Sequence, residues 1–281
     1  MTQQGYEKRI SRVLDYIHSN PAGDLSLDAL ADVAAMSRFH WHRIFRGLTG
    51  ETVAEAVRRI RMQRAATWLV QTIRPLKDVA RDSGYATTNS FARTFQQCYG
   101  LTPSAFRKLG ALTAPLSATL KGNHRMFDVQ ITNNPARRVL GIPHRGPYTD
   151  IARSFAKLGE IVGANDLMGD ARGMVGVYYD DPSAVAADAL RSHAGLIFDD
   201  QIALPKGLEE VRLPAGKTAM LRFTGPYSGL PAAYDYLYGV WLPASGLEAA
   251  NAPAFEVYLN TPMDTSPEDL ITELHLPLAQ S

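Results

Sequence analysis

Residues 82–107 read DSGYATTNSFARTFQQCYGLTPSAFR, and this stretch governs the interpretation of the first half of the chain. The two phenylalanines of FARTF lie four residues apart, which places them on one buried stripe of a helix over about 88–99. Gly84 and Gly100 stand where helices would end. The stretch therefore predicts a short helix over 76–83, a turn and a second helix, which is the outline of a helix-turn-helix.

The same outline occurs once earlier. The pattern Leu-x-x-Leu/Val-Ala begins at Leu27 and again at Leu76, and the pattern of an aromatic residue, a phenylalanine four later and a glycine five after that begins at Trp41 and again at Phe91. The expected helix starts of the first copy lie at two capping residues, Ser26 and Ser37. A longer helix over about 52–71 joins the copies and spans roughly 30 Å at about 1.5 Å per residue. That length is close to the B-DNA repeat of about 34 Å, so two recognition helices of one chain would reach successive major-groove segments.

Polar side chains gather on the outer face of each second helix. Arginine is best able to bond guanine O6 and N7 together, asparagine fits an adenine edge, and hydroxyls reach phosphates. In the first copy, the aromatic and basic residues of this face share helical spacing on a helix starting at Ser37. The candidate DNA contacts are Arg38, Phe39, His42, Arg43, Arg46, Thr88, Asn89, Ser90 and Arg93. The alternative is an ordinary solvated helix face.

The charge is unevenly distributed along the chain. Residues 1–110 carry 16 Lys and Arg against 9 Asp and Glu, whereas residues 111–281 carry 13 against 19, so the net charge of +1 hides a basic half and an acidic half. This asymmetry points to a polyanionic partner for the first half and a different role for the second.

Residues about 6–108 resemble the duplicated helix-turn-helix domain of AraC/XylS-type transcriptional regulators. The motifs that carry the resemblance are YGLTPSxFR at 99–107, DSGY at 82–85 and SFxRxF at 90–95. The resemblance implies promoter binding, with base readout by Phe39, His42 and Arg43 in the first helix and by Thr88, Asn89 and Arg93 in the second.

Beyond residue 110 the hydrophobic period changes to an alternating one. The motif HRGPY at 144–148 returns as FTGPY at 223–227, and Val-Tyr at 177–178 returns at 257–258 with nearly the same offset. Each copy is expected to hold two strands, a GPY turn, a helix and a further strand. The predicted fold class is multidomain: an all-α double helix-turn-helix domain over 1–110, a linker over 111–124, and an α+β tandem-repeat domain with an antiparallel sheet over 125–281.

Glu256 is the candidate binding residue of the second half. Strand alternation in the apolar run FEVYL places it on one face with Tyr258, and Gly176 takes its place in the other copy, which suggests one asymmetric cavity between the repeats. An ionised carboxylate among aromatic rings is costly unless a cation offsets its desolvation, so a lipophilic organic cation is the expected ligand. An exposed position on the wet face of an antiparallel strand is the alternative.

Residues about 126–278 resemble the gyrase-inhibitor-like effector-binding domain. The motifs are the two GPY turns, GVYYDDP at 176–182, WLPxSG at 241–246 and FExYLN at 255–260. The resemblance implies a hydrophobic, cationic or aromatic effector. It assigns ligand binding to Glu256, Trp241, Tyr148 and Tyr258, and Tyr227 is a further candidate.

The sequence argues against a membrane-spanning, a secreted or a metal-binding protein. The longest apolar runs, such as 139–142, are too short to span a bilayer, and no apolar segment follows Met1 to Arg9 as in a secretory signal, so a cytoplasmic protein without a membrane partner is expected. Cys98 has no second cysteine to pair with, and no CxxC or HExxH spacing is present, so we expect no metal or other cofactor.

The sequence as a whole predicts a DNA-binding transcriptional regulator, not an enzyme, whose second half senses a small molecule. The expected partners are double-stranded promoter DNA, the hydrophobic effector and RNA polymerase. Two alternatives remain open for the second half. One is a hydrolase of small electrophilic compounds, with Glu256 as base and Tyr148 or Tyr258 as acid, and the other is a module that binds gyrase or polymerase.

Overall fold

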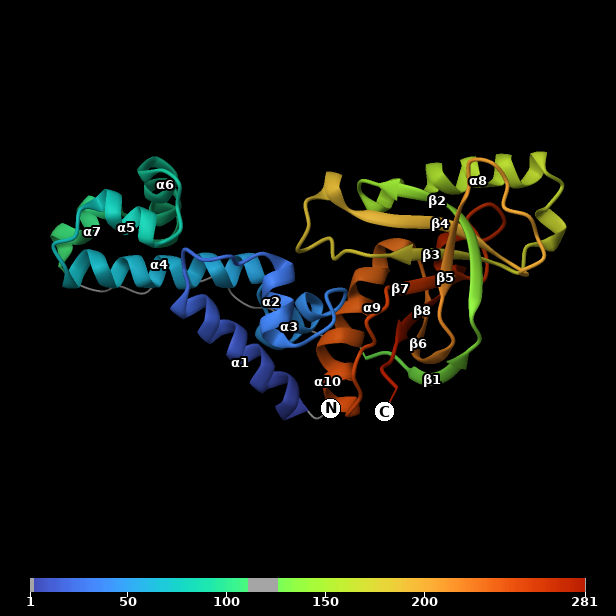
Figure 1. The fold of residues 1–281 in the computed structure, drawn as a ribbon, viewed down its shortest axis with the longest axis horizontal. Helices are drawn as coiled ribbons and strands as arrows, with labels where there is room; N and C mark the ends of the chain where they lie inside the picture. Colours follow the sequence, from blue (N-terminus) through green and yellow to red (C-terminus); the bar gives the residue numbers. More distant parts are fainter. Residues whose placement is uncertain (1–2, 111–125, 281) are drawn as a thin grey trace. The chain divides into compact units, whose positions relative to one another are not determined.

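The computed structural model describes residues 3–110 and 126–280 of the chain, so the linker expected at 111–124 lies outside the described residues. The described residues form two compact units (Figure 1). One unit holds residues 4–38 and 49–110. The other holds residues 39–48 together with 126–280.

The first unit is helical, as its sequence period predicts. Its helices are α1 (Gln3–Ser19), α2 (Leu27–Ala34), α4 (Val53–Gln71), α5 (Leu76–Asp82), α6 (Thr88–Tyr99) and α7 (Pro103–Leu109). The expected N-cap at Ser26 is confirmed, since its hydroxyl accepts a hydrogen bond from the Ala29 amide. Thr52 and Glu55 form a reciprocal capping box at the start of α4. Helices α5, α6 and α7 pack on α4 near the end that leads into α5 (Figure 1).

The second helix-turn-helix has an aromatic core. The rings of Phe95 and Tyr99 stack with their centroids 4.7 Å apart, and Phe106 from α7 packs edge-on against Phe95 at 5.1 Å. Gly84 ends the preceding turn with φ of +78°, and a Cβ there would lie 2.6 Å from the carbonyl oxygen of Pro21. Both the left-handed backbone and this close approach require glycine, which explains why the DSGY turn has one.

Helix α3 (Trp41–Thr49) begins later than a cap at Ser37 predicts. Residues 38–40 form a turn, and the first helical hydrogen bond runs from the Ile44 amide to the His40 carbonyl at 3.1 Å. The expectation that Phe39 shares a helix face with His42 is therefore wrong, because Phe39 precedes the helix. Residues 39–48 belong to the same compact unit as the sheet.

The described part of the second half forms one eight-stranded antiparallel sheet with strand order β1-β6-β8-β7-β3-β4-β2-β5. The strands are β1 (Val129–Asn134), β2 (Arg137–Arg145), β3 (Gly173–Tyr178), β4 (Arg191–Phe198), β5 (Glu209–Leu213), β6 (Gly216–Thr224), β7 (Ala254–Tyr258) and β8 (Ile271–Pro277). The strand order has an internal symmetry: β3 and β7 meet at the centre, and each repeat's first strand pairs with the other repeat's second.

The repeat predicted from the GPY turns is confirmed, except that each copy has two strands after its helix instead of one. Gly146 and Gly225 have φ of 129° and 137°, a region open to glycine, and each turn leads through a short 3-10 helix into an α-helix. These helices are α8 (Ala152–Ala164) after Tyr148–Asp150, and α9 (Leu230–Tyr236) after Tyr227–Gly229. A π-helical turn, Leu237–Trp241, continues α9 into α10 (Leu242–Ser245). Helix α8 packs on β2 and β4, and α9 packs on β6 (Figure 1).

Each face of the sheet has its own core. Leu140 and Ile142 of β2 meet Leu158 and Val162 of α8 on the helix-covered face. Val139, Val175 and Val257 lie in a separate cluster. Alternation along β7 then assigns Glu256 and Tyr258 to the face opposite Phe255 and Val257. The face on which Glu256 lies is therefore a consequence of strand register.

Candidate functional site

Glu256 is buried at the centre of the sheet. Its residue is 4% exposed, on strand β7, and its Cα is paired directly with that of Gly176 on β3. The alternative of an exposed position on a wet strand face is therefore wrong. Burying a carboxylate is costly unless hydrogen bonds or charges compensate, and so its partners decide what the site can do.

Three tyrosine hydroxyls supply that compensation. Tyr234 of α9 donates to Glu256 Oε1 at 2.9 Å, and Tyr258 donates to Oε2 at 2.8 Å. Because the Tyr258 proton is directed to the carboxylate, the Tyr178 hydroxyl donates to the Tyr258 oxygen, at 2.6 Å. The chain of donors ends on Glu256 from two sides, which stabilises its charged form.

Gly176 makes this arrangement possible. A Cβ at this position would lie 2.8 Å from the hydroxyl oxygen of Tyr258 and 2.8 Å from the ring of Tyr178. Such separations are shorter than van der Waals contact, so a side chain here would push the two hydroxyls apart. The carboxylate and the glycine of the two repeats thus lie directly opposite, and the glycine leaves room for the tyrosines.

Burial shifts the pKa values of the ionisable groups at this site. Desolvation raises the pKa of Glu256 above its ordinary value, although the hydrogen bonds from Tyr258 and Tyr234 and the positive charge of Arg43 oppose that rise. Desolvation likewise raises the pKa of Tyr178, Tyr234 and Tyr258 well above 10. The three hydroxyls therefore remain protonated donors at neutral pH.

Further rings surround this network. Tyr148 packs edge-on against Tyr178 with centroids 4.8 Å apart, and Tyr227 and Phe155 contact Tyr258 at 5.6 and 5.7 Å. The Tyr148 hydroxyl donates toward the carbonyl oxygens of Asp180 and Arg191 at 2.9 and 3.0 Å rather than toward Glu256. The structure thus joins Tyr148, Tyr227 and Tyr258 to the Glu256 site through ring contacts.

Trp241 takes no part in these ring contacts. It lies in the π-helical turn, partly exposed, and makes no ring contact or hydrogen bond among the described residues.

Tyr178 and Tyr234 are members of the site that the sequence interpretation missed. Tyr178 had a usable signal, since it is the counterpart of Tyr258 in the other repeat, whereas the contact of Tyr234 with Glu256 depends on how α9 packs.

The Glu256 site also receives a cation from helix α3, within the same compact unit. The Cζ atom of Arg43 lies 4.5 Å from the centroid of the Tyr234 ring and 5.1 Å from that of Tyr238. Its Nη2 donates to the Asp180 carbonyl oxygen at 3.2 Å. Burial lowers the pKa of Arg43, but Tyr238, Asp181 and further neighbours together raise it by more, so the guanidinium remains charged.

Two histidines flank Arg43. The Nε2 atom of His40 donates to the Ala252 carbonyl at 2.8 Å, so its Nδ1 accepts from the Tyr238 hydroxyl at 2.8 Å. Burial lowers the pKa of His40 to about 3. His42 lies 3.5 Å from Asp181, and burial lowers its pKa as well, although Asp181 opposes this shift. Both imidazoles are neutral at pH 7.

The remaining DNA-contact candidates are more accessible. Asn89, Ser90 and Arg93 on α6 are exposed, Thr88 is partly exposed, and Arg38 is exposed before α3. Ser90 also takes part in the N-cap of α6, because its amide donates to the Thr87 hydroxyl at 3.1 Å. The Arg46 side chain is 42% exposed and lies 3.5 Å from Asp235. Helix α6 presents an exposed polar face, whereas His42 of α3 is buried and Arg43 is partly buried.

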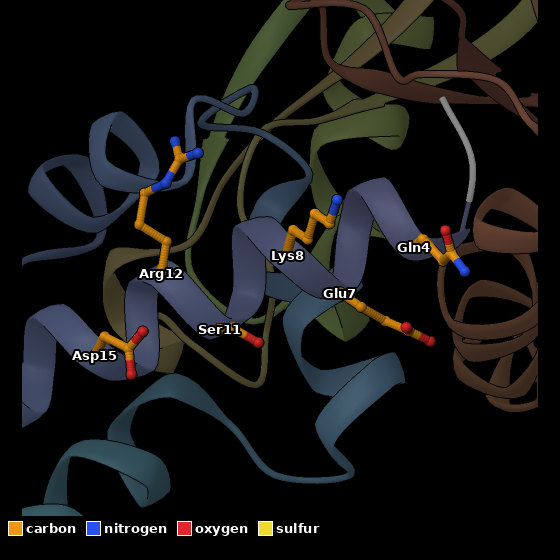
Figure 2. A pocket seen from close by; sticks show the side chains of 6 residues that line it. All are labelled: Gln4, Glu7, Lys8, Ser11, Arg12 and Asp15. Carbon is orange, nitrogen blue, oxygen red and sulfur yellow. The ribbon is translucent and has the colours of Figure 1, made fainter.

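A shallow surface depression on helix α1 carries no converging chemistry. Figure 2 shows its six side chains projecting along one helix, with Lys8 and Arg12 directed away from Glu7 and Ser11. Within residues 3–110 and 126–280, no group of three or more His, Cys, Asp or Glu side chains is arranged to hold a metal ion. Among the described residues, no helix is both long and apolar enough to cross a membrane.

A helical region with two helix-turn-helix outlines, followed by a tandem-repeat antiparallel sheet around a buried acid, defines the class of the protein. The model of the GyrI-like small molecule binding domain matches residues 127–279, and a helix-turn-helix domain model matches residues 30–109. The chain belongs to the GyrI-like family, whose match covers more than half of its length. Both expected resemblances and the expected fold class are confirmed.

Known relatives are similar to this chain in its helical part. The uncharacterized HTH-type transcriptional regulator YbfP of Bacillus subtilis is 32% identical over 102 residues, which cover 36% of this chain and 35% of that protein. The regulatory protein SoxS of Salmonella typhimurium is 31% identical over 102 residues, covering 36% of this chain and 95% of SoxS. The chain thus spans about a third of the length of YbfP. A crystal structure of the EcmrR C-terminal domain aligns with a TM-score of 0.44 and 17% identity, covering 56% of this chain and all of that one.

Proposed function

We propose that the protein is a transcriptional regulator that binds promoter DNA through its helix-turn-helix region and a lipophilic organic cation at Glu256. The observation that supports this most directly is the buried Glu256 carboxylate, hydrogen-bonded by Tyr234 and Tyr258 within a set of aromatic rings. The relatives similar in the helical part have the names of regulators. The same proposal includes a cytoplasmic location, where promoter DNA is found, and RNA polymerase as a further partner.

The preference for a cation follows from the site's charge and rings. A buried carboxylate attracts a positive ligand strongly, and ring faces add cation–π attraction. A neutral ligand of the same shape would gain apolar contacts only. Arg43 already occupies a ring face beside Glu256, at 4.5 Å from the Tyr234 centroid, and so the surroundings of Glu256 accommodate a delocalised cation.

The DNA-binding surface is centred on helix α6. Asn89 and Arg93 are exposed one helical turn apart, which suits an adenine edge and a guanine edge in one major groove. Thr88 and Ser90 at the start of α6 would contact phosphates. Helix α3 would contribute His42, Arg43 and Arg46, and the turn before it Arg38 and Phe39, when these side chains are accessible.

Calorimetric titration of the full chain tests ligand binding. The probes are a lipophilic quaternary ammonium ion and its uncharged carbon analogue, each added to the wild type, Glu256→Gln and Glu160→Gln. Glu160 is an exposed carboxylate on α8 and serves as the matched control. We expect saturable binding of the cation that weakens at least about tenfold in Glu256→Gln alone. Binding that is equal for both probes, or indifferent to Glu256, would exclude a cation sensor.

A hydrolytic activity is the second candidate, because the raised pKa of Glu256 suits a general base. Its expected acid partners are poorly placed for that task. The Tyr258 hydroxyl already donates to Glu256, and the Tyr148 hydroxyl donates to two backbone carbonyl oxygens. The geometry therefore favours binding, and time-dependent loss of an activated ester that disappears in Glu256→Gln would establish catalysis instead.

A further inference from the structure

Polar residues of helix α3, and His40 directly before it, contact the rest of the sheet-containing unit. His40 bonds Tyr238 and Ala252, Arg43 lies over the rings of Tyr234 and Tyr238, and the remaining pairs involve acidic residues. Those acidic contacts are His42 with Asp181, at 3.5 Å, and Arg46 with Asp235, at 3.5 Å. Three of these side chains are also candidate DNA contacts in the sequence analysis: His42, Arg43 and Arg46.

The backbones also meet at a pair of glycines. A Cβ on Gly47 of α3 would lie 2.2 Å from the Cα of Gly239, and a Cβ on Gly239 would lie 2.8 Å from the Cα of Gly47. Only glycine at both positions permits this approach. Gly239 lies in the π-helical turn after α9, a local distortion that is frequent at functional sites. Shape and charge therefore both fit α3 to this surface.

Tyr234 links the α3 contact to the ligand site. Its hydroxyl donates to Glu256 while its ring face holds the Arg43 guanidinium. The Asp180 carbonyl oxygen is likewise shared, since it accepts from both Arg43 and Tyr148. Arg43 thus has the charge expected of the effector and uses the same ring that completes the Glu256 network.

We propose that the rings of Tyr234 and Tyr238, with Asp180, Asp181 and Asp235, form a docking surface for helix α3, with Arg43 as an internal cation at the Glu256 site. The consequence of this docking rests on the proposed function: a cationic effector competes with Arg43 for the Glu256 site and releases the DNA-reading side chains of α3. A ligand shifts such an equilibrium only by its difference in affinity for the two states, and competition for one site supplies that difference.

Histidine footprinting of the full chain with diethyl pyrocarbonate tests docking without a ligand or DNA. Buried His40 and His42 are expected to react at least about tenfold more slowly than exposed His18, the internal reference. Gly239→Ala should remove that protection, whereas Gly159→Ala, in open space on α8, should leave it intact. Tyr238→Phe, which deletes one hydroxyl, is a milder second variant. Equal reactivity of the three histidines in the wild type would overturn the proposal.

The quaternary ammonium probe tests the competition separately. In the wild type it should raise the reactivity of His42, and Gly239→Ala should bind it roughly three- to tenfold more tightly because Arg43 no longer competes. Bound probe with unchanged protection of His42 would refute competition. If the probe binds neither protein while Gly239→Ala still unmasks the histidines, docking stands and the cation-sensor function fails.

Discussion

At the scale of single residues, Glu256 depends on its neighbours more than on its own position. The carboxylate is tolerated in the core because Tyr234 and Tyr258 donate to its two oxygens, and the position of the Tyr258 hydroxyl depends on the absent side chain of Gly176. The sequence indicated Glu256 and Gly176 as counterparts. The structure adds that they are direct strand partners.

Gly176→Ala should therefore destabilise the sheet domain. The added methyl would meet two tyrosine hydroxyl groups at under 3 Å, and overpacking of this kind costs about 1–3 kcal/mol. Gly173→Ala on the same strand is the matched control, because its Cβ would find its nearest neighbour at 3.6 Å. Urea unfolding of both variants measures the difference, and equal midpoints would contradict the close packing at Gly176.

His275 makes stability depend on pH. Its ring is buried, stacks on Phe255 at 4.7 Å, and burial together with Arg137 lowers its pKa below the ordinary 6.5. The unfolded chain then binds more protons as the pH falls below about 6.5, so stability is full above that pH and declines below it. The slope is at most about 1.4 kcal/mol per pH unit for one histidine.

Urea unfolding at pH 7 and pH 5 measures this effect. His275→Asn should show a smaller loss of stability between the two values than the wild type does. His18→Asn, at an exposed position, should retain the full loss. If the stability of His275→Asn depended on pH as that of the wild type does, the effect would belong to other groups, such as His40 and His42.

At the scale of elements, helix ends follow local chemistry where capping residues are present. The starts of α2 and α4 agree with Ser26 and Thr52, because each hydroxyl satisfies an amide of the first turn. The start of α3 does not follow this rule. The His40 side chain bonds Tyr238 and Ala252, far away in the sequence, and no local pattern contains those partners.

Thr52→Ala should cost about 1 kcal/mol of stability through the lost capping box. Thr67→Ala, within the same helix α4, is the control. Its hydroxyl bonds the Gln63 carbonyl one turn back, an interaction that adds little to a helix, so the change should be near zero. Thermal unfolding followed by circular dichroism distinguishes the two, and a larger effect at Thr67 would contradict the capping interpretation.

Arg93→Ala on α6 should cost about 1–3 kcal/mol of DNA binding and relax base preference, because we propose that this exposed arginine reads guanine. Fluorescence anisotropy on a selected duplex and a mixed-sequence duplex measures both effects. Lys77→Ala removes an exposed charge from α5 as the control for electrostatics. An equal loss on every duplex would make Arg93 a phosphate contact instead.

At the scale of the whole molecule, binding at the two halves should be coupled. If the cation releases α3, it tightens DNA binding, and DNA must then tighten cation binding by the same factor. Anisotropy titrations of a mixed-sequence duplex with and without the quaternary ammonium probe measure one factor, and calorimetry with and without the duplex measures the other. Gly239→Ala should bring both factors close to one, and a factor of one in the wild type would exclude coupling through α3.

The fold was predictable from sequence because its signals are local and repeated. Helical spacing in residues 82–107, the two GPY turns and the return of the Val-Tyr pair at 257–258 each reflect a backbone constraint within a short stretch of chain. Glu256 was also within reach, since a carboxylate inside an apolar strand stands out against strand alternation.

The partners of Glu256 and Arg43 were decided by packing. Tyr234 reaches Glu256 from another element, and Arg43 reaches Tyr234 from helix α3, which belongs to the opposite half of the sequence. No spacing rule encodes such contacts, because they depend on strand register, the π-helical turn and the close approach of Gly47 to Gly239. The amino-acid pattern was sufficient for the two kinds of domain and the charged residue, and three-dimensional packing decided which side chains surround that residue and whether α3 is free.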